Sequence, residues 1–268
     1  MAAGKRMALI IGNGEYSIAP LKNPVNDARA MSESLRSLGF KVKLKENGTL
    51  REMIEAIRSF SLASRGSKVR LFYYAGHGFQ LSGKNYLLPV DIEAATIAEL
   101  SNKSVDVSEL LRRLQTLPGG VNLVILDACR THPYLSTLRV GTRGPRGFGK
   151  TNGLAQVMAP KGTLIAFSTA PDSVSNDGDS RNSTYTKYLL SYMASPGLPI
   201  EQLFKRVRVA VAEETREAQI PWESSSLTGD FCFKPGPNGR CQFAEAGEVV
   251  PAELSQTAGA ELPRGHKR

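Results

Sequence analysis

Short apolar runs alternate along this chain with segments in which apolar residues recur every three or four positions. Runs of the first kind predict buried strands, and segments of the second kind predict amphipathic helices. The predicted strands cover residues 7–12, 41–44, 69–75, 121–127, 163–168 and 228–233. The predicted helices cover residues 27–38, 49–60, 106 or 108 to 117, 184–193 and 200–217. This alternation indicates an α/β fold, with a mostly parallel central sheet flanked by helices on both faces.

Local signals mark some element and domain boundaries. Thr49 and Glu52 have the spacing of a capping box and predict the start of a helix. Ser82 and Gly83 predict the turn of a hairpin. We expect the folded body to span residues 4–235. The remainder, 236–268, is rich in Pro, Gly, Ala and Glu without periodicity, which predicts a disordered tail or a linker.

Two of the predicted strands lead directly to reactive side chains. The strand at 69–75 is followed by His77, and the strand at 121–127 is followed by Cys129. Because ligands bind beyond the carboxyl ends of parallel strands, we expect the two side chains to meet at one sheet edge. A thiol beside an imidazole is the minimal machinery of a cysteine hydrolase. Either residue alone would favour an ordinary role, as a strand-end histidine or a buried strand cysteine, and their joint position favours the catalytic interpretation.

Charge and composition limit which other classes of protein this chain can belong to. The net charge is +9, but the positive residues are mostly scattered and no nucleic-acid-binding motif surrounds them, so we expect no nucleic-acid partner. No apolar run approaches the roughly 20 residues that span a bilayer, and no signal peptide is evident, so we expect a cytoplasmic protein without membrane contact. The three cysteines have no regular spacing, which argues against a disulfide framework and against zinc. Cys232 is predicted to be a small core residue.

One segment, residues 139–153, differs from the rest in composition. It holds five glycines, four basic residues and no acidic residue, which predicts an exposed, easily cleaved loop. The basic residues are Arg139, Arg143, Arg146 and Lys150. The segment nearly matches a phosphate-binding loop, but no strand leads directly into it, so we do not predict nucleotide binding.

The motifs around the two reactive residues resemble a known family. Tyr74-Ala-Gly-His-Gly78 resembles the Tyr-Ser-Gly-His-Gly motif of metacaspases and bacterial caspase homologues, and Asp127-Ala-Cys-Arg-Thr131 keeps the Ala-Cys-Arg of caspases. His77 lies about 50 residues upstream of Cys129, as in caspases. Leu21–Ala28 and Ile220–Leu227 also resemble segments of this family. The resemblance covers about residues 5–234 and identifies the chain as a caspase-like cysteine peptidase, close to metacaspases and paracaspases.

The resemblance implies a caspase-like fold and a role for each matching residue. Cys129 is expected to be the nucleophile and His77 its acid/base partner, with the backbone N–H groups of Gly78 and Cys129 forming the oxyanion hole. By the same resemblance, residues 4–138 correspond to the large subunit of caspases and residues 154–235 to the small subunit. Residues 139–153 correspond to the linker that is cut between them. The loop arginines and lysine are therefore candidates for autoprocessing.

The resemblance also predicts which peptides are cut. Asp27 and Asp127 match acidic residues of the metacaspase pocket, and Asp177 falls where caspases keep a substrate-binding arginine. Three carboxylates in place of arginines predict cleavage after Arg or Lys. Each aspartate has a simpler alternative as a cap or turn residue. Asp172 is either a fourth pocket acid or a turn residue, and Trp222 either lines the site or belongs to the core.

We therefore expect an endopeptidase whose partners are peptides with a basic residue before the scissile bond. No cofactor is predicted; Asp172, Asp177 and Asp179 form an acidic cluster, so calcium dependence stays open, but their spacing matches no calcium loop. Alternatives are a clostripain-like or separase-like peptidase with the same dyad, and a catalytically silent scaffold on the same fold. A nucleic-acid-binding module is a further alternative, motivated only by the net charge of +9. No motif bears on the oligomeric state.

Overall fold

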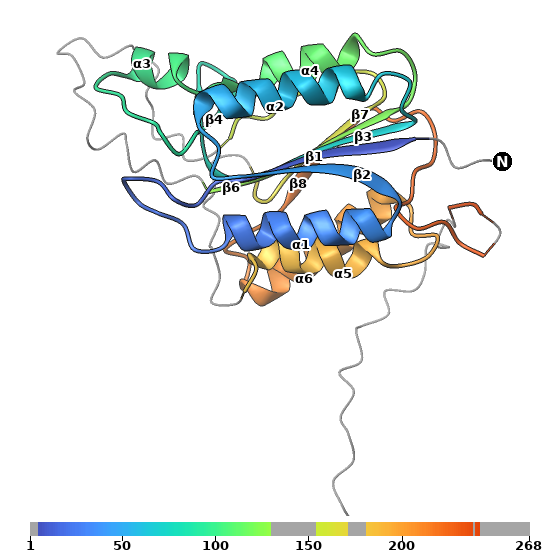
Figure 1. The fold of residues 1–268 in the computed structure, drawn as a ribbon. Coiled ribbons are helices and arrows are strands. Elements are labelled where there is room, and N and C mark those ends of the chain that lie inside the picture. Colours follow the sequence, from blue (N-terminus) through green and yellow to red (C-terminus); the bar gives the residue numbers. More distant parts are fainter. Residues whose placement is uncertain (1–4, 130–153, 171–180, 238, 242–268) are drawn as a thin grey trace, which may run out of the picture.

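A computed structural model describes residues 5–129, 154–170, 181–237 and 239–241, which form one sheet with helices on both faces (Figure 1). The strands are β1 (Arg6–Gly12), β2 (Phe40–Glu46), β3 (Val69–Leu81), β4 (Lys84–Leu87), β5 (Val105–Asp106), β6 (Val121–Cys129), β7 (Thr163–Phe167) and β8 (Trp222–Ser225). The helices are α1 (Pro24–Ser37), α2 (Leu50–Ala63), α3 (Ile97–Asn102), α4 (Val107–Gln115), α5 (Thr184–Met193) and α6 (Ile200–Glu214). The predicted α/β class is confirmed.

The main path of the sheet has the strand order β2-β1-β3-β6-β7-β8. All neighbours on this path are parallel except β7 and β8, which are antiparallel. The long strand β3 continues past the parallel region and pairs there with β4 in an antiparallel hairpin. The order reverses between β1 and β3, so the carboxyl ends of β1, β3 and β6 lie together where open α/β sheets bind ligands.

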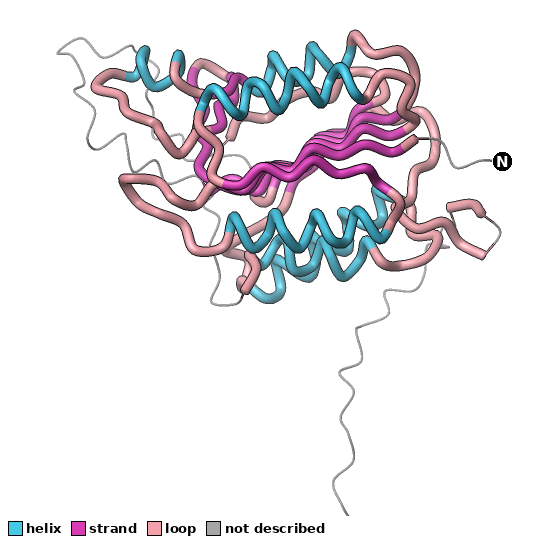
Figure 2. Tube along the Cα trace, in the orientation of Figure 1, coloured by secondary structure: helices cyan, strands magenta, loops and turns pink. Residues whose placement is uncertain are grey.

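Helices bury both faces of the sheet, which explains why its strands read as continuous apolar runs. Figure 2 shows the strands as one layer between two layers of helices. Ala8 and Ile10 of β1 lie in a core cluster with residues of α1, α5 and α6. Leu9 and Ile11, one position along, lie in the opposite cluster with residues of α2 and α4. Alternate residues of one strand therefore hold two helix layers in place.

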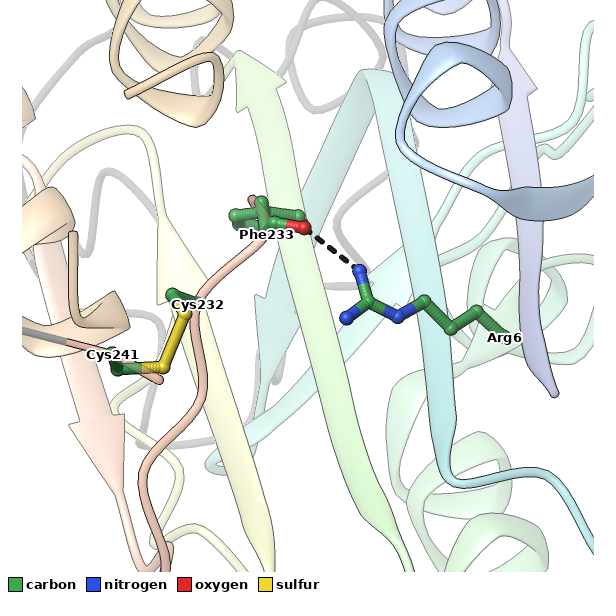
Figure 3. The surroundings of a disulfide bond; sticks show 4 residues. All are labelled: Arg6, Cys232, Phe233 and Cys241. Carbon is green, nitrogen blue, oxygen red and sulfur yellow. Dashed lines mark hydrogen bonds between the residues drawn. A yellow bond between two sulfur atoms is a disulfide. The ribbon is translucent and has the colours of Figure 1, made fainter. Parts of the chain in front are cut away.

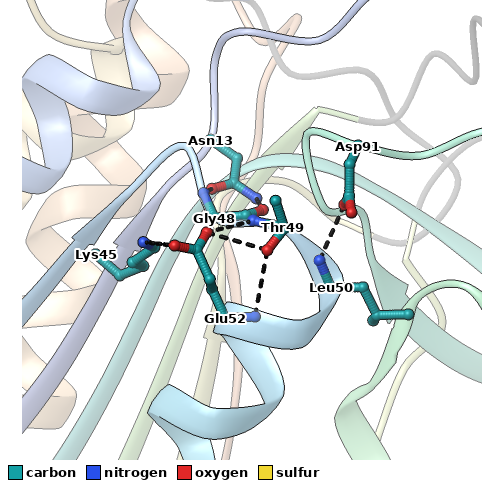
Figure 4. A network of polar contacts seen from close by, with 7 residues as sticks. All are labelled: Asn13, Lys45, Gly48, Thr49, Leu50, Glu52 and Asp91. Carbon is teal, nitrogen blue, oxygen red and sulfur yellow. Dashed lines mark hydrogen bonds and ion pairs between the residues drawn. The ribbon is translucent and has the colours of Figure 1, made fainter.

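The predicted capping box begins α2 as expected. Thr49 accepts a hydrogen bond from the backbone of Glu52, and the Glu52 side chain accepts one from the backbone of Thr49 at 3.0 Å. Figure 4 shows how this helix start is tied to the end of β1. Asn13 accepts from the Gly48 N–H at 2.9 Å and donates to the Leu88 carbonyl at 3.0 Å. This network fixes the start of the loop that follows β1.

The predicted hairpin is confirmed, and its turn explains its sequence. Ser82 and Gly83 have φ angles of 50° and 76°, both left-handed. Two consecutive left-handed residues make the tight turn whose twist matches a β-hairpin.

The predicted last strand at 228–233 is wrong. The strand that closes the sheet is β8, which pairs with β7, whereas Phe231 and Phe233 are buried in the core without strand pairing. An apolar pattern indicates that a segment is buried. Here the burial comes from side-chain packing in the core, and no strand forms. The short elements α3 and β5 were not predicted.

The expectation that the cysteines form no disulfide is also wrong, because Cys232 and Cys241 are bonded (Figure 3). A turn closed by the hydrogen bond from Gly239 N to the Gly236 carbonyl brings their Cα atoms to 5.7 Å. The described chain thus continues beyond the expected boundary at residue 235. Arg6 donates to the Phe233 carbonyl at 2.7 Å and ties this segment to β1.

A buried arginine, Arg70, lies at the amino end of the central strand β3. Arg70 has no exposed surface and donates to the carbonyls of Ser64, Pro118 and Gly119 at 3.2, 3.0 and 2.6 Å. Arg70→Met leaves these acceptors without their donor, and each unsatisfied buried group costs about 1–3 kcal/mol. We expect Tm to fall by several degrees in thermal denaturation. The exposed Arg65→Met is the control, and an equal Tm for the two variants would contradict this role.

Candidate active site

The histidine and cysteine singled out in the sequence lie on adjacent parallel strands. The register of β3 and β6 pairs His77 with Cys129. The chain thus brings these two backbone positions opposite each other at the carboxyl edge of the sheet, where we expected them.

The His77 ring is buried and held by the loop after β1. Its Nε2 lies 2.8 Å from the carbonyl oxygen of Ala19, and the ring packs on Tyr16 with centroids 4.5 Å apart. A carbonyl only accepts, so Nε2 carries the proton and, in the neutral ring, Nδ1 keeps its lone pair. Ala19 has a left-handed φ of 52°, which is uncommon for a residue with a Cβ and typical of functional sites. No sequence motif marks a backbone carbonyl, so this partner was not predicted.

Two tyrosines explain the glycine before the histidine. The Tyr16 hydroxyl accepts from the His77 N–H at 3.0 Å, and the Tyr74 hydroxyl donates to the His77 carbonyl at 2.7 Å. Gly76 has a φ of 151°, and a Cβ there would lie 2.6 and 2.7 Å from the two hydroxyl oxygens. Only glycine therefore fits between the tyrosines that fix the histidine backbone.

Gly78 lies in a tight place, although there is more room than at Gly76. A Cβ there would lie 3.2 Å from the Ala128 Cβ and 3.3 Å from a methyl group of Leu154. Packing between β3 and β6 thus accounts for this glycine in addition to the expected role of its N–H group.

The two predicted pocket acids that the structure describes, Asp27 and Asp127, meet at the amino end of α5. Asp27 Oδ1 accepts from Asn182 Nδ2 at 2.8 Å and from the Ser183 N–H at 3.0 Å. Asp127 Oδ2 accepts from the hydroxyls of Ser183 at 2.5 Å and Thr186 at 3.0 Å. Both aspartates are buried. Ser183 is also the N-cap of α5, so one residue joins the helix to both carboxylates.

This arrangement changes the protonation of Asp27. Burial is the largest cause and the Asp127 carboxylate the second, and together they raise the pKa of Asp27 to about 8. The hydrogen bonds from Asn182 and Ser183 act in the opposite direction. Asp27 therefore keeps its proton at neutral pH.

The raised pKa of Asp27 predicts how stability depends on pH. Its ordinary value is 3.8, so between about pH 4 and 8 the folded state binds more protons at this site than the unfolded state. The contribution of Asp27 is fully present below pH 4 and is lost as the pH rises through 8. Relative to Asp27→Asn, the wild type should lose Tm across this window. A Tm difference that is constant with pH would contradict the shift.

Other predicted site residues have different outcomes. Asp172, Asp177 and the basic loop 139–153 lie outside the described residues. Trp222 is 38% exposed and pairs in register with Phe167, so its interpretation as a core residue is wrong. Within the described ranges no cluster of His, Cys, Asp and Glu has the geometry of a metal site, and no helix is long and apolar enough to cross a bilayer.

The strand β3 carries His77 and the neighbouring strand β6 ends at Cys129, on a sheet covered by helices, so the chain is an α/β protein with the arrangement expected of a cysteine peptidase. The chain belongs to the caspase domain family, which matches residues 5–232. The resemblance seen in the motifs and the caspase-like fold are therefore confirmed. This family assignment indicates a cysteine-type peptidase.

Individual relatives agree with this assignment. Mucosa-associated lymphoid tissue lymphoma translocation protein 1 of Homo sapiens is 33% identical over 159 residues, which are 56% of this chain and 19% of that protein. Caspase-1 of Mus musculus is 25% identical over 248 residues, or 86% of this chain and 60% of that protein. The chain thus spans only part of each. The structure of caspase-1 from Spodoptera frugiperda shares the fold, with a TM-score of 0.64 at 21% identity over 88% of this chain and 92% of that one.

Proposed function

We propose that this chain is a cysteine endopeptidase that cleaves peptide bonds after Arg or Lys. The observation that carries the proposal is the register of His77 with Cys129, next to a buried pair of carboxylates that meet at α5. The histidine and cysteine would catalyse hydrolysis of the peptide bond, and the pair of carboxylates would bind a basic side chain of the substrate.

In the proposed reaction the Cys129 thiol transfers its proton to Nδ1 of His77, and the sulfur forms a bond to the substrate carbonyl carbon. The carbonyl electrons move to the oxygen, which the N–H groups of Gly78 and Cys129 stabilise. When the oxyanion collapses, the C–N bond breaks and the amine leaves with the proton from His77. Water, deprotonated by His77, then hydrolyses the thioester and regenerates the thiol. The Ala19 carbonyl stabilises the imidazolium formed in between.

Asp27 and Asp127, with Asp177, are proposed to receive the basic side chain. A buried carboxylate pair is stabilised by a cation, and a substrate aspartate is repelled. Because Asp27 holds a proton at neutral pH, binding of Arg or Lys releases it.

Fluorogenic peptides that end in Arg, Lys or Asp test the proposal. We expect hydrolysis of the first two by the wild type, none of the third, and no hydrolysis by Cys129→Ala. Absence of turnover on every peptide would favour the scaffold alternative. Activity on Asp peptides alone would overturn the assignment of the acid pair.

We also propose autoprocessing between residues 139 and 153. The segment offers Arg139, Arg143, Arg146 and Lys150, the side chains that an acidic pocket accepts, among five glycines that let it extend into a cleft. Intact-mass analysis should show the wild type cut near these residues and Cys129→Ala whole. Adding active wild type to Cys129→Ala distinguishes cleavage in cis from cleavage in trans. An uncut wild type that is active on peptides would leave the segment as a linker.

A further inference from the structure

A relay of hydroxyl groups runs from the centre of the sheet to the acid pair. The Tyr73 hydroxyl of β3 lies 2.7 Å from Oγ1 of Thr186 on α5, and Thr186 Oγ1 donates to Asp127 Oδ2 at 3.0 Å. A carboxylate only accepts, so the hydrogen of Thr186 is committed to Asp127. Its oxygen therefore accepts from Tyr73, and the direction of the relay is fixed.

The relay is built from buried groups. Neither Tyr73 nor Thr186 has exposed surface. Burial, and then the charges of Asp27 and Asp127, raises the pKa of Tyr73 well above its ordinary value, so the phenol remains a neutral donor. A buried hydroxyl chain that is fully satisfied holds its members in a single arrangement.

The same carboxylate oxygen has a second donor. Ser183 Oγ donates to Asp127 Oδ2 at 2.5 Å and accepts from the Thr186 N–H at 3.1 Å. One bond alone lets a carboxylate turn about its last torsion, which is intrinsically broad. Two donors on the same oxygen, the N-cap Ser183 and Thr186 three residues later in α5, define the plane of the carboxylate.

We propose that Tyr73 and Thr186 are specificity-determining positioning residues that favour Arg over Lys by fixing the plane of the Asp127 carboxylate. The inference rests on the proposed function, because it assumes that the acid pair receives a basic side chain. A guanidinium is planar and pairs with a carboxylate in a fixed fork, whereas an ammonium is a point charge that tolerates rotation of its partner. Loss of the fixed plane should therefore weaken Arg binding more than Lys binding.

The test compares kcat and KM for two fluorogenic peptides that differ only in Arg or Lys before the cleaved bond. Thr186→Val removes the hydroxyl and keeps the shape. We expect KM for the Arg peptide to rise and the Arg-to-Lys ratio of kcat/KM to fall about tenfold, the size of one hydrogen bond to a charged group. Thr186→Ser should restore the ratio. Tyr73→Phe should also lower the Arg-to-Lys ratio of kcat/KM, but less than Thr186→Val does.

Tyr185→Phe is the matched control, because Tyr185 is equally buried on α5 and its hydroxyl has no hydrogen-bond partner among the described residues. In Tyr185→Phe the Arg-to-Lys ratio of kcat/KM should stay at the wild-type value. The alkylation rate of Cys129 by iodoacetamide, which does not involve the pocket, should be unchanged in every variant. If Thr186→Val does not fold, Tyr73→Phe and its control still decide the question.

The experiment distinguishes failure of this inference from failure of the proposed function. A wild type that cleaves basic peptides, with a ratio that Thr186→Val and Tyr73→Phe leave unchanged, overturns the inference alone. Equal losses on the Arg and Lys peptides also overturn it, because they indicate a purely structural role. A wild type that cleaves neither peptide overturns the proposed function, and the inference with it.

Discussion

Replacing Cys129 with alanine should reduce kcat/KM for peptide cleavage by roughly four orders of magnitude or more, because no other thiol is available to form the thioester. Cys129 is the only one of the three cysteines outside the disulfide. Iodoacetamide under non-reducing conditions should therefore modify one site in the wild type and none in Cys129→Ala. The rate of this modification measures the reactivity of the thiol without a peptide.

His77→Ala should lower activity by a similar factor, and the double variant should be no worse than either single one, because the two residues act as a unit. The structure adds that this substitution also affects stability. The imidazole packs on Tyr16 and bonds the Ala19 carbonyl, so its removal leaves a cavity and should lower Tm. Residual activity of Cys129→Ala within tenfold of the wild type would mean that the nucleophile is elsewhere.

The central part of the fold was predictable because its strands are buried on both faces. Runs such as residues 7–12 and 121–127 have no polar alternation that permits another interpretation, and the edge rule for parallel sheets then placed His77 opposite Cys129. The start of α2 was predictable because both partners of its capping box lie within four residues. Local chemistry and sheet geometry were sufficient in each case.

The edges of the sheet and the polar partners of the site were not predictable in this way. The strand β8 has the sequence Trp-Glu-Ser-Ser and is only partly buried, so it carries no apolar pattern. The contacts of Asp27 with Asn182 and Ser183 join residues about 155 positions apart, and the sequence gives no local sign of them. The Ala19 carbonyl is backbone, and its orientation depends on a left-handed residue that precedes a proline, where extended backbone is the usual expectation.

Removing the charge of Asp127 should have opposite effects on activity and stability. Asp127→Asn keeps an oxygen that accepts from Ser183 and Thr186 but cannot pair with a substrate cation. Loss of one partner of a buried ion pair costs about 2–5 kcal/mol, so kcat/KM for Arg peptides should fall between tens and thousands of times. The same change removes a charge that raises the pKa of Asp27, which lets that carboxylate ionise more easily.

Above pH 8, where the wild type carries both charges, Asp127→Asn should therefore have a higher Tm than the wild type, as expected where a site trades stability for function. Asp106→Asn is the control, because it makes the same chemical change at a helix N-cap, where Asn is also accepted. It should leave kcat/KM unchanged. An Asp127→Asn variant with kcat/KM within threefold of the wild type, or a wild type that hydrolyses Asp-ending peptides efficiently, would show that this buried pair does not select the substrate.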